Sequence, residues 1–168
     1  RNPSLHPAFT SSARVTPMKE RELAFVYAPE IEGLSYPPDC PFKTQRASLT
    51  RSKIASFGLL GAPNIPEIAA RQATSAELRQ IHSAYYLEEL QRAAAGDLTA
   101  AGFRMGLGGS DTPVFKDMFE YGDWACGAGL VAAHRLVSGQ ADIAFNLLGG
   151  FHHAMPAHAG GFCYLNDV

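Results

Sequence analysis

Two adjacent histidines are the residues of this sequence best suited to chemistry. His152 and His153 lie in the stretch GGFHHAMPAHAGGFCYLNDV, residues 149–168. An imidazole ring titrates near neutral pH, so it can accept and then donate a proton within one reaction. The pair would therefore supply one or two acid/base groups. The alternative is that both are surface or hydrogen-bonded loop histidines, and composition alone favours this plainer interpretation.

A local metal site is a third interpretation of the same stretch. His153, His158 and Cys163 are spaced five residues apart, and they offer the nitrogen and sulfur ligands that zinc takes in tetrahedral sites. Their spacing matches no common zinc module, however, and glycines fill the gaps between them. The sequence therefore argues against a metal site built from these three residues alone.

The segments around the histidines place them where an α/β protein forms its binding site. Residues 143–148, IAFNLL, predict a buried strand, and Gly149-Gly150 ends it. In open α/β sheets, ligands bind outside the carboxyl ends of the strands. A second glycine pair, Gly160-Gly161, permits backbone conformations or close approaches that a side chain would block. The histidines are thus expected at the binding edge of a sheet.

The rest of the sequence alternates between strand and helix signals. Residues 23–27, LAFVY, predict a buried strand, and a proline-rich loop follows over residues 29–41. Two helices are predicted over 44–60 and 115–137, with a glycine-rich loop at 101–113. Two shorter helices are predicted between them. One starts at Thr74, which forms a capping-box pattern with Glu77, and the other runs from Ser83 through Leu90 to an end near Gly96. This alternation predicts an α/β fold with a parallel sheet.

Length and composition exclude several classes of protein. The chain has 168 residues, which suits about one domain. Hydrophobic residues make up 46% and charged residues 18%, so the composition is that of a globular protein and not of a disordered one. The net charge of -2 provides no basic field for direct nucleic-acid binding. No apolar run approaches the roughly 20 residues that a membrane-spanning helix needs.

The cysteines and residues 1–20 indicate where in the cell the protein is expected. The three cysteines, Cys40, Cys126 and Cys163, are widely spaced and predict no disulfide framework. A reducing compartment is therefore expected, which means a cytoplasmic protein, or a nuclear one if the source is eukaryotic. Residues 1–20 are predicted to be a flexible tail, with a transit-like leader as the alternative. Residues 21–168 would form the folded part.

The histidine stretch closely resembles a known family. GGFHHAMPAHAGGFCYLND is similar, without gaps, to the His-His loop and following helix of class I histone deacetylases and of acetoin-utilisation-type deacetylases. Four other segments also resemble the family: FVYAPEI (25–31), SYPPDCPFKTQR (35–46), ATSAELRQIHSAYYLEEL (73–90) and GSDTPVFKDMFEY (109–121). The resemblance covers about residues 22–168.

The resemblance implies a fold and an activity. The fold would be a three-layer α/β sandwich with a mostly parallel sheet (arginase/deacetylase-like), incomplete in this chain. The activity would be that of a zinc-dependent hydrolase acting on acetyl-lysine in a protein or peptide, or on a small acetylated amine. Two alternatives remain, namely a non-catalytic binding module that keeps part of the fold, and an acetylpolyamine amidohydrolase.

The resemblance also implies roles for six residues. His153 would be the general base and then the acid, and His152 would act electrostatically. Asp111 would accept hydrogen bonds from the substrate backbone. Phe162 would form one wall of the tunnel that receives the acetyl-lysine side chain, and the Gly161 carbonyl would lie at the floor of that tunnel. Arg46 would lie near an internal cavity for acetate. Three of these have plainer alternatives. In these alternatives, Asp111 caps the long helix, Phe162 is a core residue, and Arg46 holds a structural ion pair.

This sequence departs from the class I pattern at two places. Asp39-Cys40-Pro41 stands where class I enzymes often have Gly-His-Pro, and Thr112 stands where a cysteine is common. Both departures suit the acetoin-utilisation branch. The zinc ligands of the family, an Asp-x-His motif and a later aspartate, would follow Val168, so no metal ligand is expected within this chain. The chain alone is therefore expected to be inactive and to fold poorly.

Overall fold

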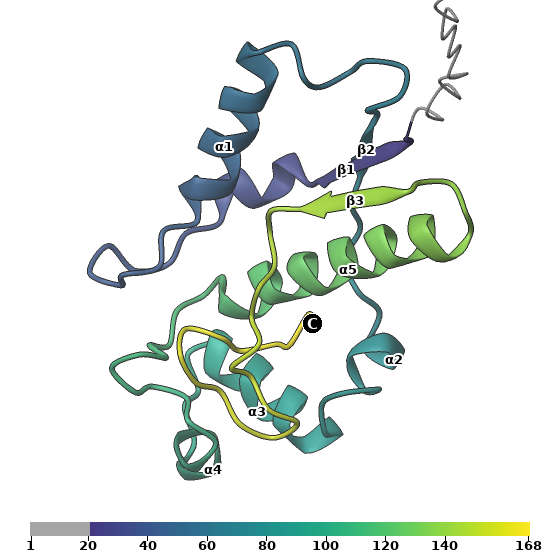
Figure 1. Ribbon diagram of the computed structural model, residues 1–168. Helices are drawn as coiled ribbons and strands as arrows, with labels where there is room; N and C mark the ends of the chain where they lie inside the picture. Colours follow the sequence, from purple (N-terminus) through teal and green to yellow (C-terminus); the bar gives the residue numbers. More distant parts are fainter. Residues whose placement is uncertain (1–20) are drawn as a thin grey trace, which may run out of the picture.

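The computed structural model describes residues 21–168, so the predicted tail over residues 1–20 lies outside the described part of the chain. Three short strands form the centre of that part: β1 (Leu23–Tyr27), β2 (Glu67–Ala69) and β3 (Ile143–Asn146). They are parallel and lie in the order β2-β1-β3 (Figure 1). Phe25 of the central strand pairs with Glu67 on one side and with Phe145 on the other. The predicted parallel sheet is confirmed.

The central strand has the residue types that a strand covered on both sides requires. Its sequence LAFVY is buried from Ala24 to Tyr27, as expected for a parallel strand that has a neighbour on each edge and packing on both faces. Strand β3 ends at Asn146, two residues earlier than the pattern 143–148 predicts. The Asn146 side-chain oxygen accepts a hydrogen bond from Leu148 N at 2.9 Å, and this turns the chain out of the ladder.

Residues 21–168 also contain five α-helices and one 3-10 helix. They are η1 (Pro29–Gly33), α1 (Gln45–Ser56), α2 (Ser75–Leu78), α3 (Ala84–Ala94), α4 (Ala100–Arg104) and α5 (Met118–Val137). Helix α5 packs against β1 and β3, while α1 lies on the opposite side of the sheet (Figure 1). Among the described residues, no helix is long and apolar enough to cross a membrane.

Two of the predicted helix starts are confirmed by side-chain caps. Thr74 and Glu77 form the complete capping box at α2, in which each side chain accepts from the other residue's backbone N–H. Ser83 caps α3, and its hydroxyl accepts a hydrogen bond from Tyr86 N at 3.2 Å. Such caps matter because the first N–H groups of a helix have no partner inside the helix.

The other helix predictions need correction. Helix α1 ends at Ser56 and not at residue 60, because Gly58 adopts a left-handed conformation with φ +70°. The segment predicted as a glycine-rich loop contains α4, which is capped by the Thr99 hydroxyl accepting from Gly102 N at 2.9 Å. Helix α5 starts at Met118 rather than Phe115. Residues 164–168, where the helix after the histidine loop was expected to begin, form neither helix nor strand.

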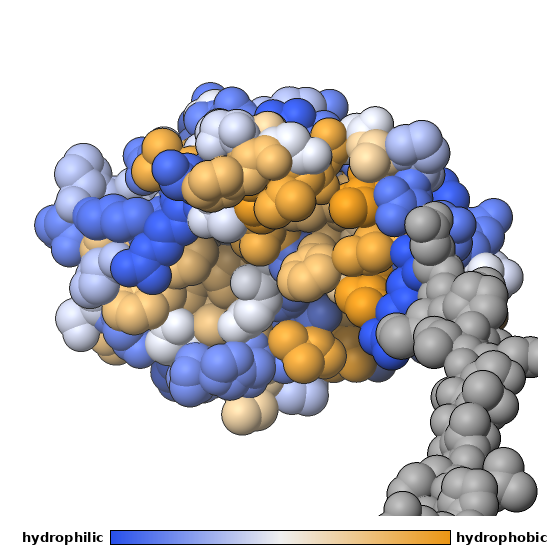
Figure 2. Space-filling model, turned by 45° about the horizontal axis from the view of Figure 1, so that its top comes forward, coloured by the Kyte–Doolittle hydropathy of each residue, from blue (hydrophilic) through white to orange (hydrophobic). Residues whose placement is uncertain are grey.

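An apolar groove separates α1 from the sheet. It encloses about 330 Å³ and is lined by Leu23, Ala24, Phe25, Ile54, Leu59, Leu60, Ile65 and Phe145. Hydrophobic side chains gather on this face of the molecule (Figure 2). Phe145 is half exposed there. The sheet is therefore less completely covered on the α1 side than on the α5 side.

Asp123 of α5 gives the protein a predicted pH-dependent stability. Its side chain is 8% exposed, its Oδ1 has no hydrogen-bond partner among residues 21–168, and burial raises the pKa of its carboxyl from 3.8 to about 6. Between those two pH values the folded state holds a proton that the unfolded state has lost. The stability contributed by this group is therefore present in acid and is lost as the pH rises toward 6.

The variant Asp123→Asn isolates this effect, because an amide does not titrate. Urea unfolding of the full-length gene product with and without this substitution, at several pH values, measures the difference between the two free energies of unfolding. We expect wild type to lose stability relative to the variant as the pH rises from about 4 to about 6, the window that the raised carboxyl pKa sets. If the difference in free energy of unfolding stayed constant over this range, burial would not raise the pKa of the Asp123 carboxyl.

Candidate active site

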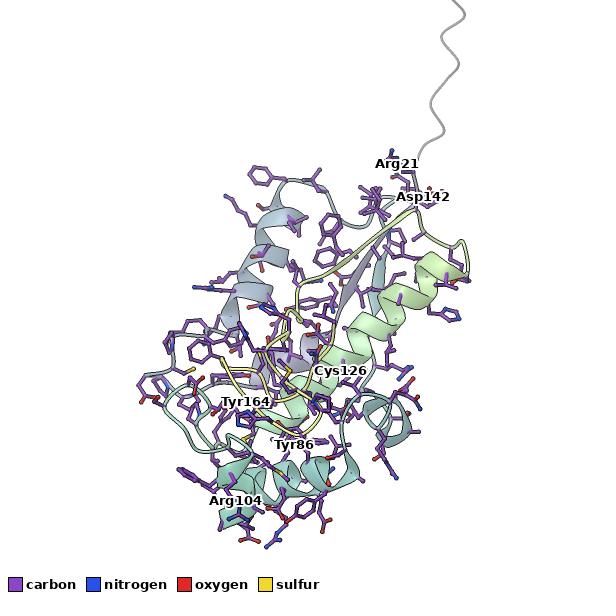
Figure 3. All side chains as sticks on the ribbon, turned by 60° about the horizontal axis from the view of Figure 1, so that its bottom comes forward. Arg21, Tyr86, Arg104, Cys126, Asp142 and Tyr164 are labelled. Carbon is purple, nitrogen blue, oxygen red and sulfur yellow. The ribbon has the colours of Figure 1, made fainter. Side chains whose placement is uncertain are left out.

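The segment that follows β3 folds back over the ends of α3 and α5 and carries the tandem histidines. It leaves the sheet at the carboxyl end of β3, where the sequence places the binding edge. Tyr86 of α3 lies beneath it, and the Tyr86 hydroxyl donates to the Tyr164 carbonyl at 2.7 Å. Both residues lie in the interior, far from Asp142 at the other end of the molecule (Figure 3).

The two histidine rings lie against each other and face solvent. Their centroids are 4.3 Å apart, and the planes are tilted by 40°. Both residues are exposed. The Nδ1 atom of His152 lies 3.0 Å from the Gly150 carbonyl oxygen. Since a carbonyl only accepts hydrogen bonds, Nδ1 must carry the proton, and the Nε2 atom of a neutral His152 then holds the free electron pair.

The turn before the histidines is held by Asp167. Its Oδ1 accepts a hydrogen bond from Phe151 N at 2.7 Å, and both of its carboxylate oxygens lie 3.0 Å from Gly150 N. The carboxylate is pressed against Gly149, where an added Cβ would lie 1.7 Å from Oδ2. The next residue, Gly150, has φ +104°. These two requirements explain the first glycine pair of the sequence.

The backbone after the histidines is held by Asn166. The Asn166 side-chain Nδ2 donates to the Ala154 carbonyl at 2.8 Å. Its own backbone N–H donates to Nε2 of His82 at 2.9 Å. His82 is buried between the α2–α3 turn and this segment, and burial lowers the pKa of its ring. A neutral ring keeps Nε2 available as an acceptor.

Asp111 accepts hydrogen bonds from the backbone of both Gly161 and Phe162. The Asp111 Oδ2 atom accepts from Gly161 N at 2.8 Å, and the Asp111 carbonyl accepts from Phe162 N at 3.0 Å. Phe162 adopts φ +67°, which is uncommon for a residue with a side chain. The buried Tyr36 hydroxyl donates to its carbonyl at 2.9 Å. An unfavourable conformation held from several sides is typical of functional loops.

Gly161 lies directly against the His153 ring. An added Cβ would lie 2.8 Å from Cδ2 and 2.9 Å from Cγ of His153, and the φ of Gly161 is +53°. At Gly160 the closest atom to an added Cβ is the His153 carbonyl oxygen, at 3.8 Å. In the second glycine pair, Gly161 therefore packs closely against the His153 ring, whereas Gly160 does not.

Five of the six residues singled out in the sequence come together. His152, His153, Asp111, Gly161 and Phe162 are linked by the contacts described above. Arg46 lies exposed on α1, and its side chain makes no hydrogen bond within residues 21–168. The alternative role of Asp111 as the helix cap is wrong, because Asp117 occupies the N-cap position of α5. The catalytic and binding roles of all six stay predictions.

A local metal site is not formed by the histidine segment. No group of three or more His, Cys, Asp or Glu side chains that could hold a metal ion occurs within residues 21–168. Cys163 is buried, its thiol donates to the Gly161 carbonyl at 3.2 Å, and burial raises its pKa. A protonated thiol that serves as a hydrogen-bond donor is a poor metal ligand.

Sequence reasoning missed the residues that hold the site together. Asp167, Asn166 and His82 bind backbone groups of the histidine segment, and Tyr36 binds the Phe162 carbonyl. The pattern of the sequence carries one signal for Asp167, since two successive glycines shortly before the histidines, separated from them by Phe151, imply that something lies close to the backbone there. It carries no signal for the others, because their contacts span long distances along the chain.

Comparison with known proteins identifies a family. The model of the histone deacetylase domain matches residues 40–168. Histone deacetylase RPD3 of Saccharomyces cerevisiae is 33% identical over 159 residues, which is 92% of this chain and 36% of that protein. Acetoin utilization protein AcuC of Bacillus subtilis is 36% identical over 148 residues, covering 88% of this chain and 38% of AcuC. The chain thus spans little more than a third of the length of these relatives.

Solved structures agree with the sequence comparison. The crystal structure of an HDAC homologue from Aquifex aeolicus superimposes with a TM-score of 0.76 at 29% identity, covering 88% of this chain and 39% of that one. A structure of an HDAC homologue complexed with SAHA gives a TM-score of 0.75, with the same identity and coverage. The arrangement of strands and helices around the histidine segment is therefore shared with these proteins.

Proposed function

Because this chain belongs to the histone deacetylase family, we propose that it provides the proton-transfer residues of an active site that hydrolyses acetyl-lysine. One observation carries the proposal. His152 and His153 are exposed, have ring centroids 4.3 Å apart and are held on a hydrogen-bonded segment at the carboxyl end of β3. Nothing in the packing of the fold requires two histidines there, so their position is best explained by chemistry.

His153 is proposed as the group that moves the proton. A water molecule attacks the acetyl carbonyl carbon, and His153 takes the proton that this water loses. As the carbon–nitrogen bond breaks, His153 delivers the proton to the lysine nitrogen, and acetate and a free amine leave. His152 is proposed to act electrostatically on the charge that develops beside it, and its ring is held in place by the contact of Nδ1 with the Gly150 carbonyl at 3.0 Å.

Asp111 is proposed to bind the substrate backbone. Its Oδ2 accepts from Gly161 N, whereas Oδ1 accepts no hydrogen bond from the residues described and the side chain is exposed. A substrate N–H group can therefore bind Oδ1 without displacing an existing partner. The hydrogen bond to Gly161 also keeps the carboxylate beside Phe162, which would contact the apolar stem of the lysine. An apolar wall favours the neutral acetylated side chain over a charged lysine.

Dependence on zinc is part of the proposal and rests on family membership alone. Residues 21–168 do not form a group of side chains that could hold a metal ion. In the full-length gene product we expect removal of zinc by a chelator to abolish acetate release, because deacetylases of this family are zinc hydrolases. Added Zn²⁺ should restore the rate. Activity that survives complete removal of metal would contradict the expected zinc dependence.

The proposed activity is tested by measuring acetate release from an acetyl-lysine peptide by the full-length gene product. Turnover of the peptide is the expected result. An acetylated polyamine offered under the same conditions serves as the control substrate. Turnover of the polyamine but not of the peptide would show that the substrates are small acetylated amines and not acetyl-lysine. No turnover of either would contradict the proposal.

A further inference from the structure

We propose that Asp167 is a positioning residue for the tandem histidines, acting together with its neighbour Asn166. The proposal rests on the proposed function, because it concerns how the proton-transfer residues are held in place. Asp167 fixes the backbone before the histidines and Asn166 fixes the backbone after them. Between these two attachments, the His152–His153 dipeptide is held at both ends by adjacent residues of the same short segment.

The contact of Asp167 with the turn requires a carboxylate. Two successive N–H groups, those of Gly150 and Phe151, point at Asp167 with distances between 2.7 and 3.0 Å. An ionised carboxylate accepts from both, and such charge-assisted bonds are stronger than neutral ones. An asparagine side chain offers one acceptor oxygen and an NH₂ group, and that NH₂ group would face a backbone N–H. The near-isosteric change from Asp to Asn therefore weakens this contact specifically.

A single peptide group connects Asp167 to His152. The peptide between Gly150 and Phe151 donates its N–H to the Asp167 carboxylate at 2.7 Å and accepts from the Nδ1 atom of His152 through its carbonyl at 3.0 Å. Hydrogen bonds in such a chain polarise one another, and each becomes stronger. Asp167 thus holds the peptide group that the His152 ring contacts, and it acts on the orientation of the ring without touching it.

The second attachment lies directly after His153. Asn166 Nδ2 donates to the Ala154 carbonyl at 2.8 Å, and Asn166 is itself held by the buried His82. The dipeptide lies outside helices and strands and is exposed. A backbone hydrogen bond from Ala154 N to the Phe151 carbonyl at 3.4 Å spans the dipeptide, and the side chains of Asp167 and Asn166 add contacts with the backbone on either side of it. A displacement of about 1 Å in a catalytic group can cost on the order of 10²-fold in rate.

The test compares Asp167→Asn with a matched control in the full-length gene product. Asp142 also accepts a backbone N–H with its carboxylate, from Glu22 at 2.9 Å, but it lies at the far end of the molecule (Figure 3). We expect D167N to lower kcat for the acetyl-lysine peptide about 10²-fold while KM stays close to wild type. We expect D142N to keep the wild-type kcat and KM. Equal kcat in D167N and wild type would overturn the proposal.

A spectroscopic readout separates this proposal from the proposed function. Amide protons that are hydrogen-bonded to a carboxylate resonate downfield, so the Gly150 and Phe151 signals should move upfield in D167N and stay in place in D142N. If wild type shows no turnover, the proposed function fails and these two signals alone decide the role of Asp167. Unchanged signals in D167N would refute it.

A second variant covers the case in which D167N does not fold. Asn166→Asp replaces the Nδ2 donor by an oxygen and sets two acceptors against each other at the Ala154 carbonyl. We expect a fall in kcat of about 10-fold, with circular dichroism unchanged, because the attachment after the histidines is lost. A wild-type kcat in N166D, or a loss of kcat that merely follows loss of the dichroism signal, counts against the proposal.

Discussion

Replacing His153 with alanine in the full-length gene product is expected to lower kcat for an acetyl-lysine peptide by about 10²- to 10⁴-fold, the range for loss of a general acid–base group. The reason is that His153 both accepts and returns the proton in the proposed reaction. The ring is exposed, so its removal leaves the core intact. Steady-state kinetics of acetate release measures the effect, and circular dichroism checks the fold.

His134 provides the control for this variant. It is an exposed histidine in the last turn of α5, remote in sequence from the site. His134→Ala removes an imidazole that is also exposed and should leave kcat unchanged. If the His153 and His134 variants both kept the wild-type kcat, His153 would have no part in the reaction.

The second large effect is expected from adding one methyl group at Gly161. The variant Gly161→Ala would place a Cβ 2.8 Å from the His153 ring at a φ of +53°. Side chains rarely adopt that conformation, and the ring must move to avoid the contact. We expect kcat to fall about 10²-fold, because a displaced catalytic group loses its alignment with the substrate. The kinetics of acetate release from the peptide measures this loss.

The neighbouring glycine supplies the matched control. In Gly160→Ala the added Cβ meets no atom closer than 3.8 Å, so kcat should remain near the wild-type value. The two variants make the same chemical change one residue apart. A similar kcat in both would mean that the close approach of Gly161 to His153 has no catalytic importance.

Local sequence patterns predicted the elements whose structure depends on near neighbours. Strand β1 was predictable because LAFVY is apolar throughout, and the α2 cap because Thr74 and Glu77 are three residues apart. The parallel sheet followed from the alternation of strands and helices. The position of the histidines at the end of β3 followed from the two glycines that terminate the strand pattern.

The parts that could not be predicted depend on contacts between distant residues. Strand β2 has only three residues, one apolar side chain among them partly buried, and it exists because β1 offers an edge to pair with. The role of Asp167 depends on the chain returning to Gly150, and the link from Tyr36 to Phe162 joins residues 126 positions apart. No local pattern encodes such pairs.

The glycines of the histidine segment were visible in the sequence, but their physical reasons were not. Gly149 makes room for the Asp167 carboxylate, and Gly161 makes room for the His153 ring. Each pair of glycines therefore marks where another part of the site touches the backbone. The resemblance to deacetylases correctly predicted the family, whereas the structure shows how this chain holds the histidines in place.

The crystal structure of the full-length H153A variant with an acetyl-lysine peptide tests the location of the site most directly. The variant should bind the peptide without turning it over. We predict that the acetyl group lies beside His152 and Gly161, that Phe162 contacts the lysine stem, and that a peptide N–H donates to Asp111 Oδ1. A peptide bound elsewhere, such as in the apolar groove between α1 and the sheet, with the histidine segment empty, would contradict the proposed function.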